Sequence, residues 1–321
     1  MTTALRATMR AARYTSFGPA ASAIGLEQIA TPVPASDEVL IRVAASSING
    51  TDLFLREASG PMRLATKLPF TPGFDVAGVV AACGPNVTAF AVGDRVYALL
   101  GHRGGGTAEY ALARQSHVAI APTSVTLEAA AAVPLSGLTA LQALRGVAGL
   151  RRGQRVLIYG ASGGIGAFAV QLAKIFGAHV AGVGRAEKLE FIAQMGTDQV
   201  FDREVGISAM ERDWDVVLDA APALSFDDVE PLLTASGVMV SVRPIPSGLA
   251  EVRGLARRSG RRWAAVRTAE RGLDLAYLAR LIDRQALRVP VDRTFALEEL
   301  VAAHQYAEGS AVKGKVIVTS A

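Results

Sequence analysis

Apolar residues in the second half of the chain alternate between short runs and helically spaced stretches. Six short apolar runs lie at residues 156–159, 180–183, 199–201, 216–218, 238–242 and 263–266. Such runs are typical of strands buried on both faces of a parallel sheet. Helical spacing lies between most of them, including 186–195 and 229–235. This alternation predicts an α/β fold with a doubly wound Rossmann sheet.

The first 122 residues follow a different pattern. Strand-like stretches lie at 8–14, 38–45, 74–82, 93–97 and 108–113, with Gly and Pro turns between most of them. Residues 46–56 are typical of a turn that leads into a short helix. Many short strands joined by such turns predict a compact β domain.

The pattern changes near residue 122 and again after residue 284. Helices are predicted at 126–133, with Thr126 as the N-cap, and at 136–149. A helix at 273–287, a β-like segment at 289–295, a helix at 297–308 and a strand at 314–319 end the chain. The last segment has no place in the six-strand sheet, so we expect it to return to the β domain. The predicted boundaries are therefore 1–122, 123–284 and 285–321.

Composition narrows the function classes. Half of the residues are hydrophobic and 19% are charged, which allows a sizeable core. No uninterrupted apolar stretch reaches 18 residues and no apolar segment opens the chain, so neither a membrane span nor a secretory signal is expected. The single cysteine, Cys83, excludes an internal disulfide and a cysteine-built metal site. Because no export signal is expected, the reducing cytoplasm is the expected location. The net charge of +4 suits an anionic cofactor as well as a nucleic acid.

A dense basic stretch contains five arginines, at positions 253, 257, 258, 261 and 262. Only Trp263 could add base stacking there, whereas single-strand binders usually combine stacking with charge. We interpret the stretch as a solvated rim or a subunit edge and expect no nucleic-acid partner.

The segment 155–166 carries the main chemical signal. Ala161, Gly163 and Gly166 hold the positions of a G-x-G-x-x-G motif, with Ala in place of the first Gly. The motif follows a predicted strand and opens a helical stretch. A tight turn, a close backbone approach to a pyrophosphate and a helix N-terminus facing that anion all require small residues there. The segment predicts a dinucleotide site.

The same letters allow two other interpretations. Residues 160–164 also spell G-x-S-x-G, the nucleophile elbow of a hydrolase, in which Ser162 would act with a later Asp and His304. A Gly-rich turn without any ligand is the third. Gly166 and the spacing of the following strands favour the dinucleotide.

The end of the second predicted strand indicates which dinucleotide binds. An NAD site usually places an acid there to bind the ribose 2′-hydroxyl. Here Gly184 is followed by Arg185, with Lys188 close behind, while Glu187 is expected to face solvent. A guanidinium can bind a 2′-phosphate, so NADPH is the predicted cofactor. The alternative is that both basic residues are ordinary surface residues.

Several segments together resemble a known family. They lie at residues 49–56, 72–80, 93–96, 108–110, 138–140, 160–166 and 314–316. In them the chain is similar to zinc-free medium-chain dehydrogenases/reductases, in particular the zeta-crystallin-like quinone oxidoreductases. The resemblance implies a GroES-like substrate domain beside a Rossmann domain, with the active site in the cleft between them. It also implies NADPH-dependent reduction of a quinone or an activated double bond, and it suggests a homodimer.

The zinc-dependent relatives of that family place a metal-binding Cys and a metal-binding His in the first two of these segments. The matching positions here are Asn49 and Phe74, which are poor replacements. The four histidines, at 102, 117, 179 and 304, show no metal-ligand spacing and are interpreted as surface or packing residues. We therefore expect no metal.

The resemblance places Asn49 and Thr139 near the nicotinamide, although Asn49 is equally suited to cap the helical turn that follows it. Asp52 and Arg56, four residues apart, are expected to form an ion pair. Phe54 stands where many relatives carry a Tyr, so solvent replaces a phenol as the proton source. A cofactor-binding redox sensor with little turnover is the alternative function. The expected cofactor residues are Gly160, Ala161, Ser162, Gly163, Gly164, Ile165, Gly184, Arg185, Lys188, Ala220, Val242 and Lys315.

Overall fold

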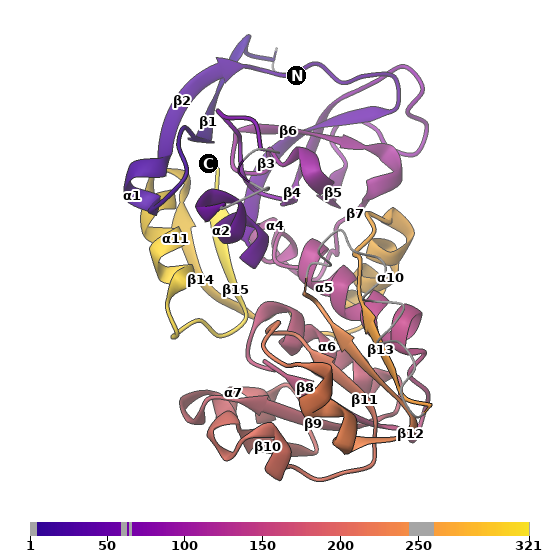
Figure 1. Ribbon diagram of the computed structural model, residues 1–321. Coiled ribbons are helices and arrows are strands. Elements are labelled where there is room, and N and C mark those ends of the chain that lie inside the picture. The colour runs from indigo at the N-terminus through magenta and orange to yellow at the C-terminus, as the bar shows by residue number, and fades with distance from the viewer. Residues whose placement is uncertain (1–4, 59–62, 64–65, 244–259, 321) are drawn as a thin grey trace. The chain divides into compact units, whose positions relative to one another are not determined.

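The computed structural model describes residues 5–58, 63, 66–243 and 260–320 (Figure 1). The chain forms two compact units. The first contains residues 1–135, 269–285 and 291–321, and the second contains 136–268 and 286–290. The first unit thus includes 123–135 and 269–285, because the carboxylate of Asp283 accepts hydrogen bonds from the N–H groups of Thr123 (2.7 Å) and Ser124 (2.9 Å). The expected boundaries at 122/123 and 284/285 stay a prediction.

In its described part, the second unit contains a six-stranded parallel sheet, visible in Figure 1. The strands are β8 (Arg155–Tyr159), β9 (His179–Gly184), β10 (Gln199–Asp202), β11 (Trp214–Asp219), β12 (Leu233–Ser241) and β13 (Arg262–Ala265). Their order across the sheet is β10-β9-β8-β11-β12-β13. This is the doubly wound order, in which strands are added on one side of the first strand, β8, and then on its other side. The predicted fold class and all six predicted strands are confirmed.

The predicted helix at 136–149 corresponds to α5 (Pro134–Leu141), which precedes β8 and continues as a π-helical segment (Gln142–Ala148). Between the strands lie α6 (Gly164–Ile175), α7 (Leu189–Gln194) and α8 (Phe226–Val229). The predicted helix at 186–195 is α7 preceded by a 3-10 turn (Ala186–Lys188). The predicted helix at 229–235 is wrong, because a 3-10 turn containing Pro231 follows α8 and Leu233 already pairs with Trp214 of β11. Proline lacks the N–H that a continuing helix needs.

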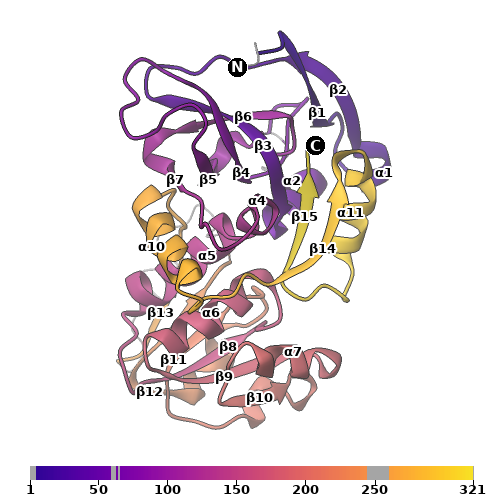
Figure 2. The same ribbon diagram turned by 180° about the vertical axis from the view of Figure 1, so that it is seen from behind.

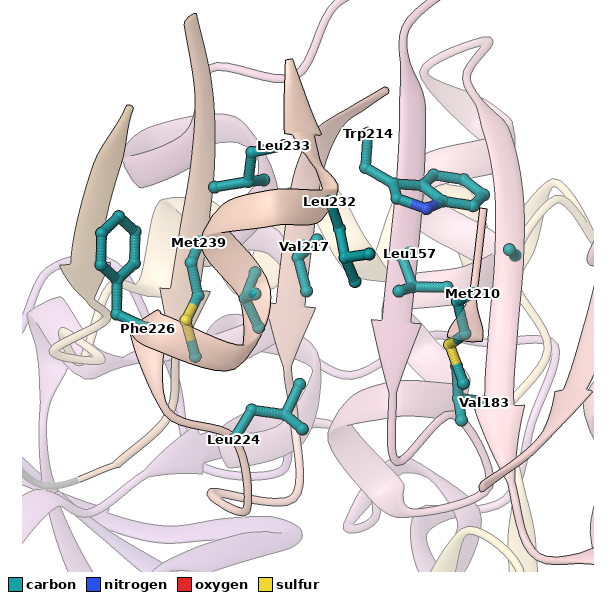
Figure 3. Packing of buried hydrophobic residues seen from close by; sticks show 12 residues of the cluster. Leu157, Val183, Met210, Trp214, Val217, Leu224, Phe226, Leu232, Leu233 and Met239 are labelled. Atoms are coloured by element: carbon teal, nitrogen blue, oxygen red, sulfur yellow. The ribbon is translucent and has the colours of Figure 1, made fainter. Parts of the chain in front are cut away.

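Buried apolar side chains cover one face of this sheet, as Figure 3 shows. Leu157, Val217 and Met239 come from three neighbouring strands and pack with residues of the segment between β11 and β12. Trp214 is 1% exposed, and its indole N–H donates to the carbonyl oxygen of Glu211 (2.6 Å). This core holds the strands in register, so that their carboxyl ends form one edge.

The described part of the first unit contains a two-stranded sheet and a larger, mostly antiparallel one. The strands are β1 (Thr8–Tyr14), β2 (Ile24–Ala30), β3 (Glu38–Ile48), β4 (Asp75–Cys83), β5 (Arg95–Leu99), β6 (Tyr110–Arg114), β7 (Val118–Ile120), β14 (Val291–Ala296) and β15 (Lys315–Thr319). The larger sheet has the order β14-β15-β3-β4-β5-β7, with β6 paired to β3. Because β15 pairs with β3, the predicted return of the C-terminal segment is confirmed.

Short helices complete the first unit: α1 (Ala20–Ala23), α2 (Gly50–Glu57), α4 (Leu127–Ala130), α10 (Gly272–Asp283) and α11 (Leu300–Glu308). Figure 2 shows α11 beside β14 and β15, where Leu300 and Ala303 are buried. The predicted cap of α4 is confirmed, because Thr126 Oγ1 accepts a hydrogen bond from the N–H of Ala129 (3.3 Å). None of the described helices is long and apolar enough to cross a membrane.

Candidate functional site

The Gly-rich turn lies at the carboxyl edge of the parallel sheet. Gly160 has a φ of +79°, in the left-handed region that favours glycine. The N–H groups of Gly160 and Ala161 both donate to the carbonyl oxygen of Val183 at 3.0 Å. Val183 belongs to the second strand, which ends at Gly184, and Arg185 follows. The turn and the proposed selector of the cofactor therefore lie together at one edge.

The glycines of this turn differ in how much space the surrounding chain leaves for a side chain. A Cβ on Gly166 would lie 2.2 Å from the carbonyl oxygen of Gly160, and one on Gly160 would lie 2.7 Å from the Cβ of Ala221. Both residues are needed for the close packing of the turn itself. A Cβ on Gly163 would meet only the Gly160 carbonyl oxygen, at an ordinary 3.6 Å, and its φ of −80° suits any residue. Among the described residues, packing does not require glycine at this position, so a side chain there would be tolerated by the turn itself.

Gly163 is also the N-cap of α6, a helix of 12 residues. Its first turn contains no acidic residue, and no side chain caps it. Gly164, Ile165 and Gly166 form this first turn, and their N–H groups have no carbonyl partner within the helix. Such a helix end carries partial positive charge and suits a phosphate. Ser162, beside these amides, is 8% exposed.

Two further predicted residues lie at the same edge. The N–H of Ala220 donates to the carbonyl oxygen of Tyr159 (2.9 Å), and that of Val242 donates to the carbonyl oxygen of Asp219 (3.1 Å). Ala220 and Val242 therefore continue the row of strand ends that begins at the Gly-rich turn. Ligands of open α/β sheets bind outside the carboxyl ends of the strands, near the point where the strand order reverses.

Thr139 is brought to the last strand of this sheet. Its side chain is 4% exposed, and its Oγ1 lies 2.7 Å from Oγ1 of Thr268, which follows β13. Sequence reasoning placed Thr139 by resemblance alone, and the pairing with Thr268 gives it a definite position within the second unit.

Asp219 is a residue of this edge that sequence reasoning missed. It is fully buried, and its carboxylate accepts hydrogen bonds from the N–H groups of Ala223 (3.1 Å) and Leu224 (3.2 Å) and from the hydroxyl of Ser241 (3.1 Å). It shapes the loop after β11. The sequence could have indicated this residue, because Asp219 is an acid at the end of a predicted apolar strand.

The basic residues after the second strand differ in exposure. Arg185 is half-buried and Glu187 is exposed, as expected, but Lys188 is only 7% exposed. Lys188 is therefore not an ordinary surface residue. Of the two, Arg185 is the one whose side chain is open to solvent and hence to a ligand.

Asn49 lies in the first unit, at the N-cap of α2. Its backbone N–H donates to Asp52 Oδ2 (2.9 Å), but its side-chain amide turns elsewhere. Nδ2 donates to Asp75 Oδ2 (2.8 Å) and to the carbonyl oxygen of Ser47 (3.3 Å), and Oδ1 accepts from the ammonium group of Lys315. The cap position is as predicted, while the amide belongs to a buried network.

Lys315 uses its ammonium group within that network. It is 3% exposed and also donates to the carbonyl oxygen of Ile48 (2.9 Å), and it lies 3.6 Å from Asp75 Oδ2. The three N–H protons of the ammonium group are thus surrounded by three oxygen atoms, from Ile48, Asn49 and Asp75. Burial lowers the pKa of Lys315, whereas Asp75 opposes that shift. Direct cofactor contact by Lys315 stays an untested prediction, and its contacts give it a role in holding Asn49.

The expected ion pair between Asp52 and Arg56 is wrong. The carboxylate of Asp52 accepts from the N–H groups of Asn49 and Gly73, both at 2.9 Å, and burial raises its pKa to about 6. Arg56 instead pairs with Glu57 (2.9 Å) and with Glu308. Two backbone donors satisfy the acid, so it needs no cation from its own helix.

The resemblance assigns the zinc-ligand positions to Asn49 and Phe74. The amide of Asn49 is committed to the network, and Phe74 is an apolar residue, 6% exposed. In the described residues, no three His, Cys, Asp or Glu side chains converge in a way that could hold a metal ion. Phe54, where relatives carry a phenol, is 51% exposed.

The hydrolase interpretation needs His304 as a base, and its surroundings disfavour that role. The ring is 1% exposed, its Nε2 lies 3.5 Å from the hydroxyl of Tyr14, and burial together with the charge of Arg56 lowers its pKa to about 3. A buried imidazole of such low basicity is a packing residue of the first unit.

Of the five arginines in the basic stretch, the structure describes Arg261 and Arg262. Arg253, Arg257 and Arg258 lie outside the described residues. The guanidinium of Arg261 donates to the carbonyl oxygens of Leu233 (3.1 Å) and Thr234 (3.3 Å), so this arginine is tied to β12.

Comparison with known proteins gives concordant matches. Residues 35–123 match the family described as Alcohol dehydrogenase GroES-like domain, and residues 195–318 match Zinc-binding dehydrogenase. The chain is 36% identical to the chloroplast envelope quinone oxidoreductase homolog of Arabidopsis thaliana over 252 residues, 75% of this chain and 77% of that protein. It is 31% identical to the chloroplastic quinone-oxidoreductase QR1 of Triphysaria versicolor over 322 residues, 97% and 98% of the two chains. The solved quinone oxidoreductase from Coxiella burnetii superposes with a TM-score of 0.90 at 30% identity, covering 98% of this chain and 100% of that one.

Proposed function

This chain belongs to the zeta-crystallin-like quinone oxidoreductases of the medium-chain dehydrogenase/reductase family, and from this premise we propose that it transfers hydride from NADPH to a quinone or another conjugated carbonyl compound without a metal ion. It is an oxidoreductase of a family that uses a nicotinamide cofactor and a small-molecule substrate. The names of the relatives support a quinone as the acceptor.

The observation that carries the proposal is Gly163. It caps a 12-residue helix at the carboxyl edge of the sheet, and its own chain leaves space where its side chain would be. The backbone can approach a pyrophosphate there, and the first-turn amides of α6 can bind it. When bound, the nicotinamide supplies the hydride, while the protein has to orient it and exclude water.

Other residues of the chain have supporting roles in this proposal. Arg185 binds the 2′-phosphate that distinguishes NADPH, because a guanidinium donates two parallel hydrogen bonds to a phosphate. Asn49 and Thr139 serve the nicotinamide end. Phe54 provides no hydroxyl, so the proton that completes the reduction comes from solvent.

Independence from metal rests on the chemistry of the donor set. The description of one matched family names zinc, but zinc needs Cys, His or carboxylate ligands, and Asn49 and Phe74 supply neither thiolate nor imidazole.

A screen of electron acceptors tests the proposed reaction. NADPH oxidation is followed with a panel of quinones and of enones, and we expect turnover with at least one quinone. Tight NADPH binding without turnover on any acceptor would instead support a redox sensor. Stoichiometric labelling of Ser162 by a fluorophosphonate would support the hydrolase and contradict the dinucleotide assignment.

A further inference from the structure

The buried network around Asn49 fixes which way its amide points. Lys315 carries only donors, and an ionised Asp75 carries only acceptors. An amide placed between them must turn its oxygen toward the lysine and its nitrogen toward the aspartate. The bonds to Oδ1 and from Nδ2 (2.8 Å) have this arrangement. The reversed amide would set donor against donor and acceptor against acceptor.

Asp75 is itself held from several sides. Its Oδ1 accepts a hydrogen bond from the N–H of Leu135 (2.6 Å), and its Oδ2 also accepts one from the hydroxyl of Ser47 (2.5 Å). The residue is fully buried. A carboxylate fixed in this way provides a rigid reference for the amide, because moving it would leave buried donors without partners.

The hydrogen-bonding capacity of the amide is nearly exhausted. Both protons of Nδ2 are donated, to Asp75 and to the carbonyl oxygen of Ser47. Oδ1 has two lone pairs, and among the described residues only Lys315 donates to it by side chain. One acceptor position on Oδ1 remains, on a residue that is 8% exposed.

We propose that Lys315 and Asp75 are positioning residues that hold the Asn49 amide so that it accepts a hydrogen bond from a hydroxyl or amide N–H of a bound ligand. The inference rests on the proposed function and deepens it. Asn49 then does not polarise a substrate carbonyl, because it has no proton left to donate. The donor belongs either to the cofactor or to the acceptor molecule as it becomes a hydroquinone.

A double-mutant cycle tests whether Lys315 acts through Asn49. One hydrogen bond corresponds to a loss of about tenfold in kcat/KM, so we expect roughly that loss for Asn49→Ala and for Lys315→Met. The double variant should also lose only about tenfold, because nothing remains to be positioned. A loss of about a hundredfold in the double variant, or full activity in either single variant, would overturn the proposal.

Two further variants separate positioning from folding. Lys315→Met leaves the Asp75 carboxylate buried without its cation, which destabilises a protein. Lys315→Met combined with Asp75→Asn removes both charges, and we expect it to fold while keeping the low kcat/KM. Lys315→Arg, which keeps a group with donors only, should recover part of the activity. Recovery of full activity by the neutral pair would contradict the proposal.

The dissociation constant of NADPH, measured by fluorescence titration over the same cycle, locates the donor. If the double variant changes this constant by less than the sum of the two single variants, the donor belongs to the cofactor. If such non-additivity is confined to the kinetic constants for the quinone, the donor belongs to the acceptor. If the parent binds NADPH but turns over no acceptor, the proposed reaction fails, and coupling in the dissociation constant still decides the positioning role. An inactive parent without such coupling contradicts both.

Discussion

Arg185 stands where an acid would favour NADH, directly after the second strand of the parallel sheet. Replacing it with alanine removes a charge-assisted contact to the 2′-phosphate, worth about 1.5–3 kcal/mol. We predict that Arg185→Ala weakens NADPH roughly ten- to a hundredfold and leaves NADH almost unchanged. Steady-state kinetics with both cofactors measure the effect.

Arg212 offers a matched control for this prediction. It is exposed and precedes β11, at the opposite edge of the same sheet. Arg212→Ala should therefore leave both cofactors unaffected. Equal losses for NADPH and NADH in Arg185→Ala, or a parent that prefers NADH, would show that Arg185 does not select the cofactor.

His304 makes stability depend on pH. Its folded pKa of about 3 lies below the ordinary value of 6.5, because burial and Arg56 disfavour the charged ring. Between these values the unfolded chain binds a proton that the folded chain does not, so stability is lost as the pH falls below 6.5. The loss reaches about 2 kcal/mol near pH 5.

Urea unfolding of the parent and of His304→Gln, at about pH 7.5 and about pH 5, measures this term. Asp52, whose pKa of about 6 is raised by burial, acts in the opposite direction, since its stabilising uptake of a proton grows as the pH falls. It is present in both proteins and cancels in the comparison. The parent should lose about 2 kcal/mol more than the variant. An identical pH dependence of the two proteins would contradict the buried neutral ring.

Some residue-scale features were predictable and others were not. The N-cap role of Thr126 follows from local sequence, because a cap involves residues only a few positions apart. The pairing of Arg56 with Glu308 does not, since the two residues lie 252 positions apart in the chain. Helical spacing suggested Asp52 as a partner, but the acid was already satisfied by backbone N–H groups that no pattern reveals.

At the scale of elements, the turn between β8 and α6 makes a paired prediction. Gly163→Val should fold normally and lose NADPH binding, because its Cβ makes only an ordinary contact of 3.6 Å in the protein, whereas its side chain blocks the pyrophosphate. Gly166→Val should lose stability instead, because its Cβ would lie 2.2 Å from the Gly160 carbonyl oxygen. Thermal unfolding and NADPH titration of both variants give the comparison. Unchanged NADPH affinity in a folded Gly163→Val would mean that the turn holds no dinucleotide.

Periodicity predicted the strands of the parallel sheet well. Its central strands β8, β9, β11 and β12 are mostly buried apolar runs, so their positions were evident. The short helix α1 and the strands β2 and β7 were missed, because β2 alternates only between half-buried and exposed positions and β7 has three residues. The helix expected at 229–235 failed because tertiary pairing of Leu233 outweighed helical spacing.

At the scale of the whole molecule, the return of the C-terminal segment to the first sheet was predictable because the Rossmann sheet was already complete. The network around Asn49 was not, although each of its members lies in a motif. Lys315 bonds to Asn49 across 266 positions, and only the pairing of β15 with β3 brings them together. The hydrogen-bond partners of Asn49 could thus not be predicted from the sequence.

Metal content is a property of the whole chain that the proposal fixes. The purified protein should contain no stoichiometric zinc, and dialysis against a chelator should leave its activity unchanged, because Asn49 and Phe74 occupy the ligand positions of zinc-dependent relatives. Elemental analysis beside the activity assay provides the measurement. Stoichiometric zinc, with activity lost to the chelator and restored by zinc, would overturn metal independence.

Hydride transfer from NADPH to a quinone is the central claim, and the initial rate of NADPH oxidation by chelator-treated protein tests it most directly. The rate should rise with quinone concentration to a plateau, with one NADPH consumed for each quinone reduced, and it should be higher with NADPH than with NADH. The absence of any quinone-dependent oxidation by a protein that is folded and binds NADPH would contradict the account.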